Sequence, residues 1–249
     1  MNFLEKYYDT FKRMNPKNTN LKLGILVITI IVMIFNGVGN FEFSWDMVIS
    51  FGVFIISMTC HEVAHGYVAY KFGDDTAKNQ GRITLNPIKH IDITGLLLPV
   101  LLLLSGAKFI IGWAKPVPVN FYRLKPQRLG LFCVAIAGIV VNLIMATSAL
   151  IFIKNFNSVS GLALNVAIYF YIINLALAFF NLIPVTPLDG GRIIYSLSGN
   201  KIRQFYDKIE PYGILIVFLM VYSGVHLGIF QDILSFFISL IDKNGIILF

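Results

Sequence analysis

The residues best suited to chemistry are two histidines and a glutamate in the segment His61-Glu62-Val63-Ala64-His65, which has the H-E-x-x-H pattern. Residues four apart in an α-helix lie on one face, so both imidazoles can reach one Zn²⁺ ion at about 2.0–2.1 Å. Glu62, next to the first histidine, can then act as general base toward a water molecule activated by the ion. The pattern predicts a hydrolytic zinc site with one ion per chain.

A catalytic zinc site usually has three protein ligands, so a third residue must join the two histidines. The candidates are Asp189, His90, Asp92, His226 and Cys60. Asp189 is favoured, because the two prolines and two glycines of segment 184–191 end the preceding apolar stretch and let the chain turn back toward the ion. The alternative role for Asp189 is to cap the next helix. For His90 we expect a loop-stabilising hydrogen bond, and for Cys60 a packing role.

Two asparagines stand in apolar surroundings. Asn142 lies in the middle of one apolar stretch, and Asn181 closes the next. Buried amides in lipid need hydrogen-bond partners, so one reading is bonding between helices. The other is a donor to the substrate carbonyl or to the developing oxyanion, which makes Asn142 a candidate catalytic residue beside Glu62.

The elements that position these residues are apolar segments long enough to cross a bilayer. Hydrophobic residues make up 57% of the 249-residue chain and charged residues only 13%, about half of the usual charged share of roughly 25%. The segments nearly free of charge are 23–39, 47–70, 93–107, 129–153, 162–183 and 212–241. Since a span takes about 20 apolar residues, we expect an all-α polytopic membrane bundle of about 5–6 transmembrane helices.

The positive charge is unevenly distributed, and this asymmetry predicts the topology. Segment 93–107 has only 15 residues; if it does not cross, 18 of the 20 Lys and Arg fall on one side, and if it crosses the tally is 11 against 9. The positive-inside rule therefore favours a re-entrant segment, or one packed within the bundle. It places the N-terminus and the opening of the active site in the cytoplasm. The net charge of +7 then reflects topology, and we expect no nucleic-acid partner.

The same topology bears on the metal site. At 1.5 Å per residue, His65 and His61 lie about 8 and 14 Å short of the inner end of their span. Asp189 follows the inner end of the segment 162–183 by only a few residues, so it falls on the same side. The charge distribution and the choice of Asp189 as third ligand therefore agree.

Outside the apolar segments, residues 1–22 form a basic segment, either an interfacial helix or a disordered tail. Segments 81–87 and 112–120 carry β-favouring residues between turn signals and are expected to be short strands on the cytoplasmic side. Pro116 and Pro118 lack amide hydrogens, so a strand there could pair fully along one edge only. Residues 23–249 are expected to be a single transmembrane domain with its catalytic core at about 47–200.

Taken together, these motifs resemble the site-2 protease family of intramembrane zinc metalloproteases. The similarity covers the segment from His61 to His65, Gly138 with Asn142, and the segment from Asn181 to Arg192. The resemblance implies that His61, His65 and Asp189 bind zinc, that Glu62 is the general base, and that Asn142 assists near the reaction centre. Ile139 stands where the family often has proline, which is a departure beside Asn142.

The resemblance also suggests where and on what the protein acts. Segments 82–92 and 112–120 look like those of small bacterial and archaeal members without PDZ or CBS modules, which implies a multi-pass protein of a prokaryotic cell membrane. The expected reaction is hydrolysis of a peptide bond in or next to a transmembrane helix of a membrane protein. A helical substrate must unwind locally, and the edge of residues 115–120 could hold it in extended form. The expected partners are thus a membrane-protein substrate and the lipid bilayer.

Two other classes remain open at this point. A membrane transporter or channel could use the histidines and Glu62 as a metal or proton pathway. It predicts polar residues spread through several spans, whereas here they converge at one depth. A protease-like protein without activity could simply bind membrane proteins.

The topology yields a first prediction. Single cysteines placed at Lys89 and at Arg123 should react with an impermeant thiol reagent from the same face of the membrane, because segment 93–107 between them does not cross. Labelling of sealed vesicles from either side measures this. Labelling of the two positions from opposite faces would rule out the non-crossing arrangement.

Overall fold

The computed structural model describes residues 44–91, 115–155, 161–222 and 235–239, together with the single residues 9, 12, 20 and 232. The sequence-based predictions for 23–39, 93–107, Asp92 and His226, and almost all of 1–22, lie outside these residues. All helices named below belong to one compact unit, which comprises residues 44–91 and 114–249.

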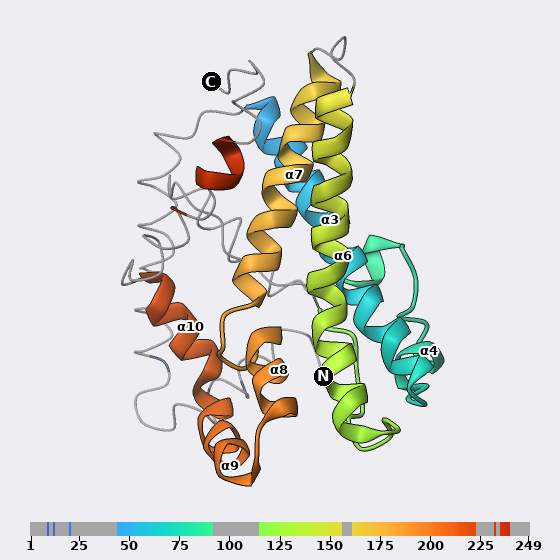
Figure 1. Cartoon of the computed structure of the whole chain (residues 1–249), viewed down its shortest axis with the longest axis vertical. Helices are drawn as coiled ribbons and strands as arrows, with labels where there is room; N and C mark the ends of the chain where they lie inside the picture. The colour runs from blue at the N-terminus through green and yellow to red at the C-terminus, as the bar shows by residue number, and fades with distance from the viewer. Residues whose placement is uncertain are drawn as a thin grey trace. The chain divides into compact units, whose positions relative to one another are not determined.

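The described chain is helical (Figure 1). Its longer helices are α3 (Trp45–Lys71), α6 (Gln127–Asn155), α7 (Leu162–Asn181), α8 (Asp189–Leu197), α9 (Asn200–Ile209) and α10 (Gly213–Tyr222). Short helical turns are α4 (Thr76–Asn79) and the 3₁₀ segments η1 (Pro87–Lys89) and η2 (Glu210–Tyr212). The expected helical class is therefore confirmed for this part of the chain.

Three of these helices, α3, α6 and α7, are long and apolar enough to cross a membrane, with 27, 29 and 20 residues and mean hydropathies of 1.7, 2.5 and 2.0. They coincide with the predicted segments 47–70, 129–153 and 162–183. Ser44 begins α3 by accepting a hydrogen bond from the amide of Asp46 at 3.1 Å. The apolar helices support the assignment as a membrane protein, and the other predicted spans lie wholly or partly beyond the described residues.

The three long helices alternate in direction. The amide of Lys125, just before α6, donates to the carbonyl of Phe72, just after α3, at 2.9 Å. The C-terminal ends of α3 and α7 and the N-terminal end of α6 therefore lie at one end of the bundle, where α4, α8 and α9 also lie (Figure 1).

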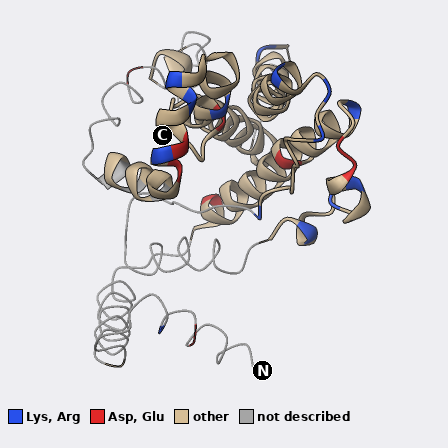
Figure 2. Ribbon diagram, turned by 90° about the horizontal axis from the view of Figure 1, so that it is seen from below, with Lys and Arg blue, Asp and Glu red and all other residues tan. Residues whose placement is uncertain are grey.

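Basic residues gather at this end, onto which Figure 2 looks. The described elements and loops at this end contain Lys71, Lys78, Arg82, Lys89, Lys115, Arg123, Lys125, Arg128, Arg192, Lys201, Arg203 and Lys208. Lys154 lies at the opposite end of α6. The described Lys and Arg residues are thus concentrated at one end of the bundle, in agreement with the charge asymmetry along the sequence.

The two flanks of segment 93–107 lie side by side. The amide of Lys115 donates to the carbonyl of His90 at 2.8 Å, so the chain leaves and re-enters the described part at the same place. A segment that crossed the membrane once would separate its two ends by the thickness of the bilayer. The non-crossing arrangement requires these two flanks to lie at the same end of the bundle, as His90 and Lys115 do; the arrangement of segment 93–107 itself stays a prediction.

The described parts of the two expected strands, 81–87 and 115–120, contain no β-strand. Side chains, rather than a neighbouring strand, hold the main chain of 115–120: Glu62 accepts from the amide of Val117, and Asp74 accepts from that of Asn120 at 2.6 Å. Arg82 donates to the carbonyl of Lys115 at 2.7 Å. Because Pro116 and Pro118 supply no amide hydrogen, few donors remain for a ladder.

The connection between α7 and α8 is held by close backbone contact with α10. Thr186, in the middle of this connection, is completely buried. A Cβ atom built on Gly213, the first residue of α10, would overlap the carbonyl oxygen of Thr186 and lie 2.9 Å from Pro187 Cδ. The absence of a side chain at Gly213 therefore lets α10 fix the loop that leads into α8.

We predict that Gly213→Ala destabilises the protein by about 1–3 kcal/mol, the cost of overpacking a buried contact. Thermal unfolding of the purified protein in detergent measures the effect. Gly199→Ala is the matched control, because a Cβ at Gly199 meets nothing within 4 Å. Equal melting temperatures for the two variants would contradict the contact.

Candidate metal centre

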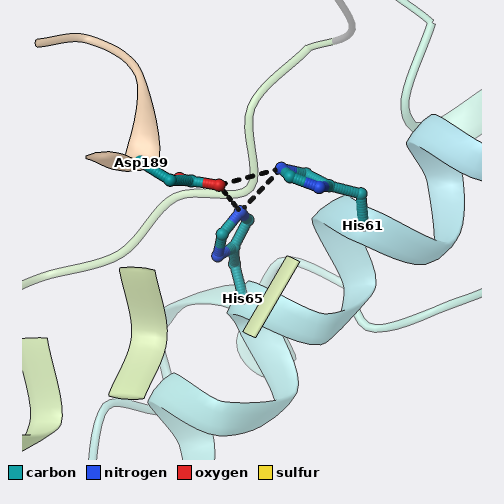
Figure 3. Close-up of side chains that lie close together, drawn as sticks. All are labelled: His61, His65 and Asp189. Carbon is teal, nitrogen blue, oxygen red and sulfur yellow. Dashed lines mark hydrogen bonds and ion pairs between the residues drawn. The ribbon is translucent and has the colours of Figure 1, made fainter. Parts of the chain in front are cut away.

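Three side chains converge on one point between α3 and α8 (Figure 3). His61 Nε2 and His65 Nε2 lie 3.2 and 3.3 Å from Asp189 Oδ2, and 3.0 Å from each other. The two histidines are one helical turn apart on α3, and Asp189 is the first residue of α8. The residues predicted as zinc ligands from sequence are therefore brought together by the fold.

The spacing of these atoms fits a metal ion. Ligand atoms placed tetrahedrally about 2.0–2.1 Å from zinc are about 3.3 Å apart, close to the observed separations of 3.0–3.3 Å. Asp189 Oδ2 is buried and has no hydrogen-bond partner among the described residues, although two imidazole nitrogens face it. A bound cation would satisfy this oxygen, so the site has the donor set and the geometry of a zinc centre.

Helix α6 packs one face against both histidines. Val134, Gly138 and Asn142 follow one another at intervals of four residues on this face, and all three are buried. A Cβ atom on Gly138 would lie 2.6 Å from His61 Nδ1 and 2.6 Å from His65 Nε2. Only glycine at this position lets the two imidazole rings lie against the α6 backbone.

The partner of His65 fixes which of its nitrogens carries the hydrogen. His65 Nδ1 lies 2.7 Å from the carbonyl oxygen of Val134. Because a carbonyl only accepts, Nδ1 is the donor, and in the neutral ring Nε2 keeps its lone pair. That lone pair points toward Asp189 and His61, as a metal ligand requires.

His61 has a different partner. Its Nδ1 lies 3.2 Å from the amide group of Asn142, with Nδ2 as the nearer atom. This is a contact between two helices, α3 and α6. Asn181, by contrast, donates within its own helix to the carbonyl of Leu177 at 3.0 Å.

Glu62 is buried and held by the main chain. Its Oε2 accepts a hydrogen bond from the amide of Val117 at 2.8 Å. Val117 stands between two prolines, so its amide is the one donor that 116–118 can offer. Arg82 anchors the same stretch through the carbonyls of Lys115 and Pro116.

Asp189 is positioned by the loop before it. Tyr206 of α9 donates to the carbonyl of Pro184 at 2.9 Å, which ties this loop to α9. Burial acts to raise the pKa of Asp189, but the neighbouring His65 and His61 rings outweigh it, so the pKa lies below its ordinary value. The carboxyl group is therefore ionised at neutral pH, the form that binds metal.

The other candidate ligands lie elsewhere or outside the described residues. His90 is buried and donates through Nε2 to the carbonyl of Thr84 at 2.9 Å, the loop-stabilising role expected of it. Cys60 is a half-buried free thiol that does not belong to the metal-binding group. Asp92 and His226 are not among the described residues.

Two contributors were missed by sequence reasoning. Val134 contributes a main-chain carbonyl and Val117 a main-chain amide. Every residue has a main-chain carbonyl, so nothing in the sequence marked Val134 as the partner of His65. For Val117 a signal existed, because the prolines on both sides leave its amide as an isolated donor.

Comparison with known proteins then identifies the family. Residues 153–223, which include Asp189, match the model of peptidase family M50. The chain is 45% identical over 176 residues to a Bacillus subtilis protein named "Putative zinc metalloprotease YwhC", covering 68% of this chain and 77% of that protein. The chain belongs to peptidase family M50. This is the site-2 protease family whose motifs the sequence resembles, so that prediction is confirmed.

A second relative of this M50 chain is a Mycolicibacterium smegmatis protein named "Putative zinc metalloprotease Rip2". It is 26% identical over 205 residues, which cover 78% of this chain and 76% of that protein. No solved structure matches the chain. The metalloprotease class and the zinc cofactor expected from the sequence are supported by these matches together with the His61, His65 and Asp189 group.

The packing of α6 against the histidines leads to a prediction. Gly138→Ala should displace both imidazole rings and weaken zinc binding by at least about 10–100-fold, the range typical for disturbing the surroundings of a metal ligand. Zinc content after dialysis against a chelator of known affinity measures this. Gly52→Ala, on the same helix as the histidines and with nothing within 4 Å of its Cβ, is the control. A Gly138→Ala protein that kept wild-type zinc content would contradict the proposed packing.

Proposed function

We propose that this protein is an intramembrane zinc metalloprotease that hydrolyses peptide bonds in or next to transmembrane segments of membrane proteins. One observation carries the proposal: two of the three side chains that could hold a metal ion, His61 and His65, are buried within the length of a helix that is apolar enough to cross a membrane. A metalloprotease of aqueous solution has no need to place its ligands there, because polar groups in lipid are costly.

The depth of the site supports this location. His65 and His61 lie six and ten residues before the end of α3 at Lys71, or about 9 and 15 Å along the helix axis. The site therefore lies within the span, toward the end where basic residues gather. By the positive-inside rule this end is cytoplasmic, and the N-terminus and the opening of the site are proposed to face the cytoplasm. The bacterial relatives favour a prokaryotic cell membrane.

The residues divide the work as follows. His61, His65 and Asp189 would hold one zinc ion. When bound, the ion would polarise the scissile carbonyl and acidify the attacking water. Glu62 takes the proton from the water and later passes it to the leaving amine. The amide of Val117 holds the Glu62 carboxylate through one oxygen, which limits the orientations of the base.

The extended stretch 115–120 is proposed to hold the unwound substrate. Alternate residues of an extended chain point to opposite edges. On one edge, the carbonyl of Pro116 and the amide of Asn120 are taken by Arg82 and Asp74. On the other edge Glu62 takes the amide of Val117 and Arg82 takes the carbonyl of Lys115, which leaves the carbonyl of Val117 and the main-chain groups of Val119 for a peptide. A peptide pairing with this edge would lie beside the general base.

A transporter or channel is less well supported. It would need polar side chains along a path through several spans. In the described helices the buried histidine and carboxylate side chains, His61, Glu62 and His65, lie within about one turn of α3, and both histidines face Asp189 at one end of the bundle. These groups therefore lie at one depth and do not form a path of ionisable side chains through the bundle.

The role of Glu62 gives a direct test. Glu62→Gln should keep one zinc ion per chain but lower cleavage of a membrane-protein substrate, reconstituted with the enzyme in proteoliposomes, by about 10²–10⁴-fold, because the general base is lost. Zinc quantification and the appearance of cleaved substrate are measured on the same preparation. Asp46→Asn, at the other end of the same helix, serves as the control and should cleave normally.

These two measurements, together with zinc flux into the same proteoliposomes, separate the competing functions. Full cleavage by Glu62→Gln would remove the role of Glu62. A wild-type protein that binds zinc but cleaves no membrane substrate would favour the inactive binder. Zinc flux into proteoliposomes without cleavage would favour the transporter.

A further inference from the structure

The amide of Asn142 stands in a position that decides how His61 can bind an ion. Asn142 is fully buried, and its amide meets His61 at Nδ1, the ring nitrogen that does not face Asp189. A neutral imidazole carries one hydrogen, so the group bonded to Nδ1 determines whether Nε2 has a free lone pair. Asn142 therefore acts on the tautomer of His61.

With Nδ2 of Asn142 donating, His61 Nδ1 must accept, and the ring hydrogen then sits on Nε2. That hydrogen points at Asp189 and blocks a cation. At the same time Asn142 Oδ1 is buried and has no hydrogen-bond partner among the described residues. The structure thus holds an acceptor without a donor, beside a ring that needs an acceptor at Nδ1 in order to bind metal.

A half-turn of the amide group supplies the acceptor that His61 Nδ1 needs, and the amide nitrogen then takes the place of the unpaired oxygen. The half-turn exchanges Oδ1 and Nδ2, which are nearly equal in size, and brings the oxygen next to His61 Nδ1. The Nδ1 hydrogen is then donated to Asn142, and the Nε2 lone pair faces the site, as the carbonyl of Val134 already arranges for His65. We propose that the side-chain oxygen of Asn142 is the acceptor that sets the metal-binding tautomer of His61.

This hydrogen bond makes Asn142 a positioning residue. The inference rests on the proposed function of His61 as a zinc ligand. Of the two readings that the sequence left open, it agrees with hydrogen bonding between helices and differs from a donor to the substrate carbonyl or oxyanion. Asn142 touches the edge of the His61 ring that is turned away from Asp189, and it has no exposed surface through which to reach a substrate in this arrangement. The backbone carbonyl that serves His65 cannot be lost by substitution, whereas the acceptor for His61 can.

The test compares two variants of the full-length protein in detergent. Asn142→Leu fills the same space without an acceptor and should weaken zinc binding by about 10–100-fold, as measured by competition with a chelator of known affinity. Asn142→Asp keeps the acceptor oxygen and should restore zinc affinity to within about threefold of wild type or better, because carboxylate–histidine–zinc arrangements are favourable. Asn174→Leu is the matched control, since Asn174 is an equally buried amide that bonds Ser57 and not a histidine.

Nitrogen-15 NMR of the histidine-labelled, zinc-bound protein adds a readout that does not depend on Asn142→Leu folding. In wild type the His61 ring should be protonated at Nδ1, and in Asn142→Asp this hydrogen should shift downfield while that of His65 stays in place, because a carboxylate is the stronger acceptor. An unshifted His61 signal, or a zinc affinity of Asn142→Leu equal to that of wild type, would overturn the proposal. A wild type that binds zinc but does not cleave contradicts the proposed function alone.

Discussion

The structure of the site depends on the close approach of α6 to the histidine face of α3. Gly138 allows both imidazole rings to lie against the α6 backbone, and the residues four positions before and after it, Val134 and Asn142, meet the remaining ring nitrogens. Two antiparallel helices with the same four-residue spacing thus support each other: α3 supplies the metal-facing atoms, and α6 supplies their hydrogen-bond partners. In a membrane, water cannot form hydrogen bonds with these groups, so the pairing offsets the free-energy cost of burying the histidines.

The third member of the site depends on a different constraint. Asp189 is 124 residues beyond His65 in the chain, and it reaches the histidines because α7 returns to the same end of the bundle as α3. The loop before α8 is then fixed by Tyr206 and by contact with Gly213. Packing of residues outside the metal centre therefore determines the position of the Asp189 carboxylate. The part of the chain that contains Asp189 matches the model of peptidase family M50.

Much of this could be predicted from the chain alone. The spacing of His61 and His65 depends only on helical geometry, and the prolines and glycines around Asp189 end a helix wherever it packs. The three spans followed from hydrophobic length. The short strands were expected from local composition and are not present in the described residues. In 115–120 the prolines lack amide hydrogens, and the side chains of Glu62, Asp74 and Arg82 take hydrogen bonds that a ladder would need.

The sequence by itself determined the candidate metal ligands, the membrane character and the asymmetry of charge, since each is a property of residue type and spacing along one helix or loop. The tertiary structure alone decided which main-chain groups serve those side chains: the carbonyl of Val134 for His65 and the amide of Val117 for Glu62. The physical reason is that backbone donors and acceptors are the same in every residue. Only packing determines which of them a buried polar side chain can reach.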